Sequence, residues 1–255
     1  MGRSPSVGCH DLPWSDGVFF VDKPAGLTSF AIVRRIRWLL GIKKVGHAGT
    51  LDPFATGLLI VCVGRPATRC IDSFMGGRKT YQARLQLGVE TETQDPEGAI
   101  TRTAPVPEWD RPSLVACLRQ HVGPQLQAPP PYSAAKHKGK PLYAYARQGV
   151  RIEKEAKPIE ILSLTLDHYD AQLHQLDLTV TCSPGTYVRV LAADIGRSLG
   201  CGAHLIGLRR TASGPFVVGD SLSGAELFTE EGLAVLQAAR RGIEETVDIV
   251  APRAI

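Results

Sequence analysis

Residues 46–57, with the sequence GHAGTLDPFATG, contain the side chain that is best placed to do chemistry. Three glycines and one proline in this stretch are typical of a shaped loop rather than the interior of a helix or strand. Asp52 precedes Pro53, which restricts Asp52 to an extended backbone and so fixes the direction of its carboxylate. Aspartate is ionised at neutral pH, because its reference pKa is about 3.9. The pattern predicts a catalytic carboxylate; the structural alternative is a turn aspartate that caps the following segment.

The segments around this loop show the hydrophobic periodicity of short strands and helices. Apolar runs at residues 17–21 and 58–63 indicate buried strands. Ser29 is expected to cap a helix that runs to Leu40 and ends at Gly41. One side of this helix is apolar, and the other carries Arg34, Arg35 and Arg37, followed in the chain by Lys43 and Lys44.

The rest of the chain mixes strands and helices. Clean alternation predicts strands at residues 81–87 and 176–182. Helices are expected at residues 111–122, 188–199 and about 229–241, whereas the proline-rich segment 124–132 is expected to begin an extended loop. The order lacks the regular βαβα rhythm of a doubly wound sheet, so we expect an α+β (mixed α/β) fold around one central sheet. We expect a loose leader at residues 1–16, one domain at 17–215 and a short helical extension at 216–255.

Composition and charge describe a soluble globular protein, with 44% hydrophobic and 21% charged residues and a net charge of +4. Residues 136–157 contain seven Lys or Arg and two Glu, which suits a polyanion such as RNA. A solvated basic loop is the alternative. The cysteines form no C-x-x-C pair, no signal peptide is visible, and the longest apolar run is too short to cross a bilayer. We therefore expect a cytoplasmic protein.

Six segments, in order along the chain, resemble the motifs of one enzyme family. They are DKPAGLTS at 22–29, GHAGTLDPFATG at 46–57, KTYQA at 79–83, YSAAK at 132–136 with Gly139, Tyr143 and Arg147, GTYVR at 185–189, and GAHL at 202–205 with LRR at 208–210. The sequence resembles the TruB family of tRNA pseudouridine synthases in all six.

The resemblance implies both a fold and a reaction. The fold is a pseudouridine-synthase catalytic domain with a central, largely antiparallel mixed sheet flanked by helices and RNA-binding loops, including a thumb-like segment at about 124–157. The reaction is the isomerisation of uridine 55 in the T loop of tRNA to pseudouridine, by glycosidic cleavage and rejoining through carbon 5. It involves no redox change or group transfer, so no cofactor or metal is expected.

By resemblance, three residues are catalytic. Asp52 starts the reaction by attack on carbon 1′, by attack on carbon 6 or by removal of the 2′ proton; the sequence leaves the three routes open. Arg189 is its ion-pair partner, since a buried carboxylate needs a cation to stay ionised. Tyr81 is the platform on which the uracil stacks, and its hydroxyl is a candidate for removing the proton from carbon 5. In isolation, Arg189 reads as a surface cation at a strand end and Tyr81 as a core tyrosine.

The remaining site residues bind the RNA. The target uridine must leave its stack, and His47 resembles the family residue that fills the gap. The substrate-binding set is completed by Tyr187, Leu208 and Lys23. Basic residues are expected to hold RNA phosphates; they are Arg34, Arg35, Lys43, Lys44, Lys136, Lys138, Lys140 and Arg147. We expect tRNA as the partner, through its T stem-loop, with a monomeric protein and no membrane or obligatory protein partner.

The sequence departs from the family at its C-terminal end. TruB proteins usually carry a further RNA-binding module, often a PUA domain, and residues 216–255 are too few for it. Two other functions remain open. A guide-RNA-dependent synthase shares the Asp loop, but it is expected to have a PUA domain. An RNA-folding protein without catalysis would not need Asp52, Tyr81 and Arg189 together.

Overall fold

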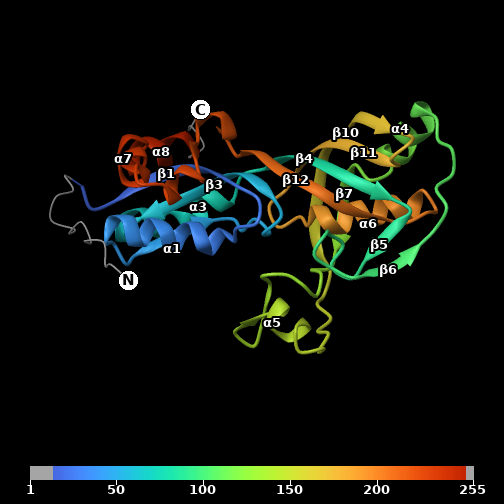
Figure 1. Cartoon of the computed structure of the whole chain (residues 1–255), viewed down its shortest axis with the longest axis horizontal. Coiled ribbons are helices and arrows are strands. Elements are labelled where there is room, and N and C mark those ends of the chain that lie inside the picture. The colour runs from blue at the N-terminus through green and yellow to red at the C-terminus, as the bar shows by residue number, and fades with distance from the viewer. Residues whose placement is uncertain (1–13, 251–255) are drawn as a thin grey trace. The chain divides into compact units, whose positions relative to one another are not determined.

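The chain forms two compact units. Unit 1 comprises residues 1–79 and 209–255, and unit 2 comprises residues 80–208. The computed structural model describes residues 14–250, so residues 1–13 of the expected leader lie outside the described residues. Figure 1 labels most of the longer elements of both units.

Unit 1 is built on one group of strands of the 10-stranded sheet, and both faces of this group are covered. Its strands are β1 (Gly17–Lys23), β2 (Val45–Ala48), β3 (Thr56–Val63) and β14 (Leu222–Ser223). β3 pairs antiparallel with β1 and β2, and β14 pairs with β1 in parallel. Alternate residues of β1 and β3 belong to two different hydrophobic clusters. This explains the uninterrupted apolar run at residues 58–63, because neither face of such a strand meets water.

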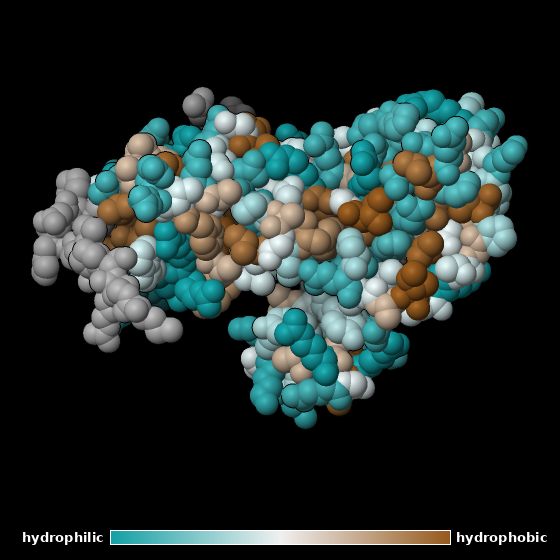
Figure 2. All heavy atoms as spheres, in the orientation of Figure 1, coloured by the Kyte–Doolittle hydropathy of each residue, from teal (hydrophilic) through white to brown (hydrophobic). Residues whose placement is uncertain are grey.

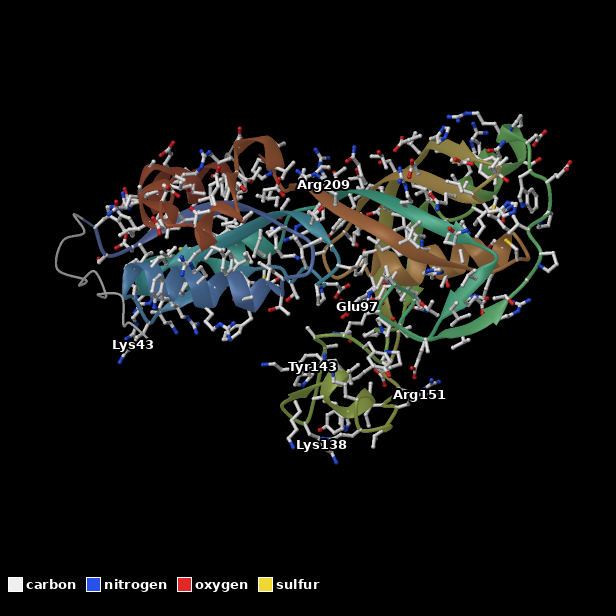
Figure 3. The ribbon with its side chains drawn as sticks, in the orientation of Figure 1. Lys43, Glu97, Lys138, Tyr143, Arg151 and Arg209 are labelled. Atoms are coloured by element: carbon white, nitrogen blue, oxygen red, sulfur yellow. The ribbon has the colours of Figure 1, made fainter. Side chains whose placement is uncertain are left out.

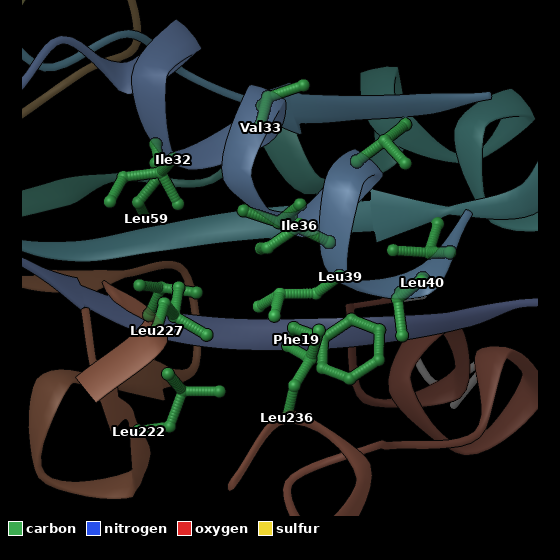
Figure 4. Close-up of a cluster of buried hydrophobic side chains, with 14 residues drawn as sticks. Phe19, Ile32, Val33, Ile36, Leu39, Leu40, Leu59, Leu222, Leu227 and Leu236 are labelled. Carbon is green, nitrogen blue, oxygen red and sulfur yellow. The ribbon is translucent and has the colours of Figure 1, made fainter. Parts of the chain in front are cut away.

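Helix α1 (Ser29–Leu40) covers one face of this sheet. Its apolar side chains pack against Phe19 and Leu59, as Figure 4 shows. The helix ends at Gly41, as predicted, but its N-cap is Thr28 rather than Ser29. The Thr28 side chain accepts a hydrogen bond from the Ala31 amide, which leaves the Ser29 hydroxyl available for another partner.

The C-terminal segment completes both hydrophobic clusters of unit 1. Its elements are β13 (Phe216–Val217), the 3-10 turns η2 (Val218–Asp220) and η3 (Glu226–Phe228), and helices α7 (Gly232–Ala238) and α8 (Ile243–Val250). Leu227 and Leu236 join the cluster under α1. Ile243 and Val247 pack on the opposite cluster, beside α2 (Gly64–Arg69) and α3 (Ile71–Met75). The helix expected at about 229–241 is present but shorter, as α7, and α8 is a second helix that the sequence did not predict.

The predicted catalytic loop is shorter than the sequence indicated. Residues 46–48 belong to β2 and residues 56–57 belong to β3, so the loop proper spans residues 49–55. His47 consequently lies on a strand opposite Val61 rather than on the loop with Asp52. The sequence did not predict β2, because this strand is short and contains a glycine and a histidine instead of a run of apolar residues.

Unit 2 contains a second group of paired strands. They are β4 (Lys79–Leu87), β7 (Gly123–Gln127), β10 (Lys157–Asp170), β11 (Gln175–Cys182) and the first part of β12 (Ala203–Ser213). β10 pairs antiparallel with β11 and β7. β7 corrects the expectation that residues 124–132 contain no regular structure. Pro124 fits there because β7 is an edge strand, where a missing amide donor is tolerated.

Two helices and two hairpins complete unit 2. The helices are α4 (Arg111–Arg119) and α6 (Val188–Ser198), both close to the predicted bounds. One hairpin is formed by β5 (Val89–Thr91) and β6 (Ile100–Thr103), and the other by β8 (Lys136–His137) and β9 (Lys140–Pro141), followed by α5 (Leu142–Ala146). Figure 1 shows α5 and the yellow-green segment around it apart from the labelled strands of unit 2.

The predicted fold class is confirmed, since helices flank a mixed arrangement of strands. β3 and the Arg209–Arg210 end of β12 pair in parallel, whereas most other pairs are antiparallel. Among the described residues, no helix is both long and apolar enough to span a membrane.

Gly57 lies directly against the backbone of Arg210, and this close approach gives a stability prediction. Its φ is 101°, and a Cβ at this position would lie 2.3 Å from the Arg210 carbonyl oxygen. We expect Gly57→Ala to lower the free energy of unfolding by more than about 3 kcal/mol, measured by urea denaturation. Gly26→Ala is the matched control: its φ is 80° with nothing within 4 Å, so only about 1–2 kcal/mol of backbone strain is expected. Equal losses would contradict the steric argument.

Candidate active site

The predicted catalytic and substrate-binding residues are divided between the two units. Lys23, His47 and Asp52 belong to unit 1, and Tyr81, Tyr187, Arg189 and Leu208 belong to unit 2. Each group is positioned by buried polar contacts within its own unit.

A buried lysine anchors the Asp52 loop. Lys23 is fully buried, and its ammonium donates hydrogen bonds to the carbonyl oxygens of Pro24, Leu27 and Pro53 at 2.9, 2.6 and 3.1 Å. A charge can be buried only when such acceptors replace the water that it loses. Pro53 directly follows Asp52, so the Lys23 ammonium fixes the backbone next to the carboxylate. The predicted role of Lys23 in substrate binding stays a prediction, and these contacts show that Lys23 also holds the backbone beside Asp52.

Ser29 and Arg210 hold the loop on its other sides. The Ser29 hydroxyl is 2.9 Å from the Leu51 amide and 3.0 Å from the Leu51 carbonyl oxygen. The buried Arg210 guanidinium donates to the carbonyl oxygens of Gly49 and Leu58, on either side of the loop, at 3.1 and 2.7 Å. Asp52 itself is half-buried at the centre of this framework. The loop is thus held at both ends and beside the carboxylate.

A partly exposed ion pair links β1 and β12, the strands that carry Lys23 and Arg210. Arg209 and Asp22, the neighbours of Arg210 and Lys23, form two parallel hydrogen bonds at 2.9 and 2.7 Å. Such a bidentate pair fixes the geometry of both partners. Three sequence motifs of unit 1 therefore interlock around Asp52.

His47 lies on β2 and is partly buried. Burial lowers the pKa of its imidazole below the ordinary value, and the charge of Arg210 lowers it further. The imidazole is therefore neutral at pH 7, and its buried Nδ1 has no hydrogen-bond partner among the described residues.

Arg189 is the central cation of unit 2. It lies in the first turn of α6 with 3% of its surface exposed, so it is not a surface residue at a strand end. One guanidinium nitrogen is 3.2 Å from the Asp95 carboxylate, which is equally buried. The guanidinium also donates to the carbonyl oxygens of Thr93 and Tyr132, each at 2.9 Å.

Asp95 is a site residue that the sequence analysis missed. Its carboxylate accepts hydrogen bonds from the Thr93 hydroxyl and, at 3.0 Å, from the Glu97 amide. Gln94, with a φ of 62°, turns the chain so that this carboxylate reaches Arg189. The segment TETQDPEG is rich in turn residues, and a polar turn gives no sign from sequence that it is buried.

The other predicted residues of unit 2 are also held by local contacts. The Gln127 side-chain amide bonds both backbone polar groups of Tyr187, at 2.7 and 3.1 Å, and so fixes the residue that caps α6. Tyr81 is buried on the inward face of β4, as its alternation predicted. Leu208 is half-buried on β12.

The basic thumb-like segment is well suited to present cations. Lys136, Lys138 and Lys140 are exposed on the β8–β9 hairpin, and Lys138 and Gly139 both have positive φ in its turn. Lys138 and Tyr143 are labelled in Figure 3, and the surface around α5 is mainly hydrophilic in Figure 2. Arg147 is exposed, with its guanidinium 5.6 Å from the Tyr143 ring centroid.

The basic residues of unit 1 divide into two kinds. Arg34, Lys43 and Lys44 are exposed, and Figure 3 shows Lys43 beyond the end of α1. Arg35 is instead committed to the protein, since its guanidinium donates to the carbonyl oxygens of Leu227 and Thr229. Arg35 therefore has fewer donors available for an RNA phosphate than Arg34 has, and its predicted phosphate contact stays a prediction.

Family models match almost the whole described chain. The model of the TruB family pseudouridylate synthase N-terminal domain matches residues 37–188, which include Asp52, Tyr81 and Asp95. The model of the tRNA pseudouridylate synthase B C-terminal domain matches residues 189–248.

The chain belongs to the TruB family of pseudouridylate synthases.

Two relatives of the chain in the TruB family are both named tRNA pseudouridine synthase B. The chain is 54% identical to the tRNA pseudouridine synthase B of Desulfotalea psychrophila, over 87% of this chain and 92% of the relative. It is 46% identical to that of Chromobacterium violaceum, over 83% of this chain and 68% of the relative. Both relatives bear the name of a tRNA-modifying enzyme.

Solved structures support the same fold. A chain in the crystal structure of a Cbf5–Nop10–Gar1 complex matches with a TM-score of 0.68 and 26% identity, over 92% of this chain and 62% of that one. A chain in the archaeal box H/ACA sRNP Nop10–Cbf5 complex matches with a TM-score of 0.66 and 24% identity. The predicted pseudouridine-synthase fold is thus confirmed for this TruB chain.

The Arg189–Asp95 pair gives a prediction that separates positioning from stability. Asp95→Asn keeps the side-chain shape but removes the negative charge beside a buried guanidinium, so we expect a loss of about 3 kcal/mol in unfolding free energy. We also expect kcat for pseudouridine formation to fall with little change in the Kd for tRNA, as measured by single-turnover kinetics and filter binding.

Glu92→Gln is the matched control. Glu92 pairs with Arg151 at 3.3 Å on the exposed side of the same segment, and an exposed pair contributes at most about 1 kcal/mol. Full kcat in the stably folded Asp95→Asn variant would exclude a positioning role for Asp95.

Proposed function

We propose that this TruB protein isomerises uridine 55 in the T loop of tRNA to pseudouridine, with Asp52 as the carboxylate that starts the reaction. The observation that carries the proposal is the framework around Asp52, in which Lys23, Ser29 and Arg210 fix the backbone on every side of it. Such a framework positions a reactive group within the tolerance that catalysis requires. The relatives' shared name supplies the substrate class.

The reaction is an isomerisation, so no atoms or electrons are transferred to or from another molecule. The bond between N1 of uracil and carbon 1′ of the ribose breaks, the detached base turns, and a bond forms between carbon 5 and carbon 1′. Carbon 5 then loses its proton, and N1 carries one in the product. A carboxylate beside the sugar can act on carbon 1′, on carbon 6 or on the 2′ proton.

We assign the catalytic roles as follows. Asp52 acts on the nucleoside, and Arg189 pairs with it so that the carboxylate stays ionised away from water. Asp95 holds the Arg189 guanidinium in place. Tyr81 stacks on the uracil, and its hydroxyl assists proton removal from carbon 5.

Binding of the tRNA is assigned to residues around this centre. The target uridine is taken out of its stack, and the neutral His47 imidazole fills the gap. Tyr187 and Leu208 line the pocket, with the thumb-like segment and the cations of α1 on RNA phosphates. We further propose a cytoplasmic monomer that acts without an obligatory protein partner.

The decisive test compares the wild-type protein with Asp52→Asn on a tRNA transcript labelled with tritium at carbon 5 of its uridines. We expect the wild type to release tritium from the T-loop uridine without added cofactor. Asp52→Asn should release none while binding the same tRNA with unchanged Kd, because an amide is neither a nucleophile nor a base.

Thumb variants provide the matched comparison. Lys136→Ala should weaken tRNA binding and reduce its dependence on salt concentration, while measurable turnover remains at saturating tRNA. Turnover by Asp52→Asn, or its complete loss in Lys136→Ala at saturation, would contradict this assignment. Binding without turnover in the wild type would favour an RNA-folding role.

A further inference from the structure

The outer face of α1 combines arginines with exposed aromatic rings. Phe30, Arg34, Arg37 and Trp38 have the i, i+4, i+7, i+8 spacing of one helix face. The opposite face is the apolar one that enters the core in Figure 4. Phe30 and Trp38 are 57% and 62% exposed, and neither packs against the core cluster. Two large rings are therefore presented to solvent on a helix that has no need of them for packing.

Trp38 is held in a fixed orientation by Arg35. The Arg35 guanidinium carbon lies 4.3 Å from the Trp38 ring centroid. That guanidinium is itself anchored by the carbonyl oxygens of Leu227 and Thr229. The indole is thus supported by an immobile planar cation while most of its surface stays open. A preorganised ring of this kind loses little conformational entropy when a planar group stacks on it.

Phe30 is supported in a similar way. The Arg37 guanidinium carbon lies 5.5 Å from the Phe30 ring centroid, and the same guanidinium donates to the Val45 carbonyl oxygen at 2.6 Å. At two places on α1, therefore, an exposed aromatic ring lies beside an arginine that is hydrogen-bonded to backbone.

The charge of this face is of one sign. Residues 29–45 contain five Lys or Arg and no Asp or Glu. Arg34, Lys43 and Lys44 make no ion pair with an acidic side chain of the described residues.

The face begins at the catalytic loop. Ser29, the first residue of α1, is bonded to Leu51, next to Asp52. Phe30 and Trp38 are eight residues apart, or about 12 Å along the helix axis. That is on the order of three to four stacked nucleotides at about 3.4 Å each.

We propose that the outer face of α1 is an RNA-binding surface on which unpaired bases of the tRNA stack on Trp38 and Phe30 while Arg34, Lys43 and Lys44 contact the adjacent phosphates. Alternating aromatic and cationic side chains are the combination that holds single-stranded nucleic acid, because every base has a π face and every linkage a charge. The proposal rests on the proposed function and extends the tRNA contact along α1, away from the Asp52 loop. An anionic membrane surface is the competing partner for such a face.

The test measures the Kd for a full-length tRNA transcript by filter binding with Trp38→Ala, Trp38→Leu and Trp38→Phe. We expect Trp38→Ala and Trp38→Leu to weaken binding roughly 5- to 100-fold, the effect of losing one stacked base. Trp38→Phe should recover most of the affinity, because it restores a π face that leucine lacks. Leu173→Ala, which truncates a side chain that is 58% exposed in unit 2, should bind as the wild type does.

Three results would overturn the proposal. One is wild-type tRNA affinity in folded Trp38→Ala and Trp38→Leu. The second is equal affinity for Trp38→Leu and Trp38→Phe, which would mean that apolar bulk and not stacking matters. The third is unchanged tRNA affinity together with Trp38-dependent sedimentation on phosphatidylserine vesicles. The tritium-release assay that compares the wild type with Asp52→Asn does not involve Trp38. It therefore separates these results from a failure of the proposed function.

Discussion

Burial of cations against backbone carbonyl oxygens is the constraint on which the rest of this structure depends. Lys23 and Arg210 sit almost wholly out of water, where an unsatisfied charge would be prohibitively costly. The chain must therefore supply acceptors, and it does so with the carbonyl oxygens of Gly49, Pro53 and Leu58. The path of the Asp52 loop is the path that satisfies these two cations.

Unit 2 also contains a buried cation whose donors must be satisfied by the protein. Arg189 is buried with one carboxylate and two carbonyl oxygens. In the assignment proposed for catalysis, it is this guanidinium that keeps Asp52 ionised. Its orientation then depends on Asp95, at the end of a polar turn. In that assignment, catalytic competence depends on Asp95, a residue that does not contact the reacting atoms.

The sequence predicted those parts of the molecule that depend on local pattern. Helix α1, the alternation of β4 and the apolar run of β3 follow from periodicity, and the glycine–proline loop indicated Asp52. It did not predict β2 or β7, which are short and lie beside glycine or proline. Nor did it predict the roles of Asp95 and Arg210, because burial of a polar side chain depends on contacts between residues far apart in the sequence. Arg35 illustrates the same limit: it shares the basic side of α1 with Arg34 but bonds the η3 turn.

The most direct test of this account is the turnover of Lys23→Met, a variant with similar side-chain volume and no hydrogen-bond donor. Leu236→Ala, a core truncation on α7 remote from the loop, controls for a general loss of stability. The account predicts that Lys23→Met, at a temperature where both variants remain folded, loses on the order of 100-fold in kcat on saturating tRNA. It also predicts faster exchange of the Ala55 amide, which donates a hydrogen bond to the Asp52 carbonyl oxygen at 3.2 Å within the loop. Leu236→Ala should keep kcat near the wild-type value. Wild-type kcat and exchange in Lys23→Met would show that the Asp52 loop holds its geometry without the buried ammonium.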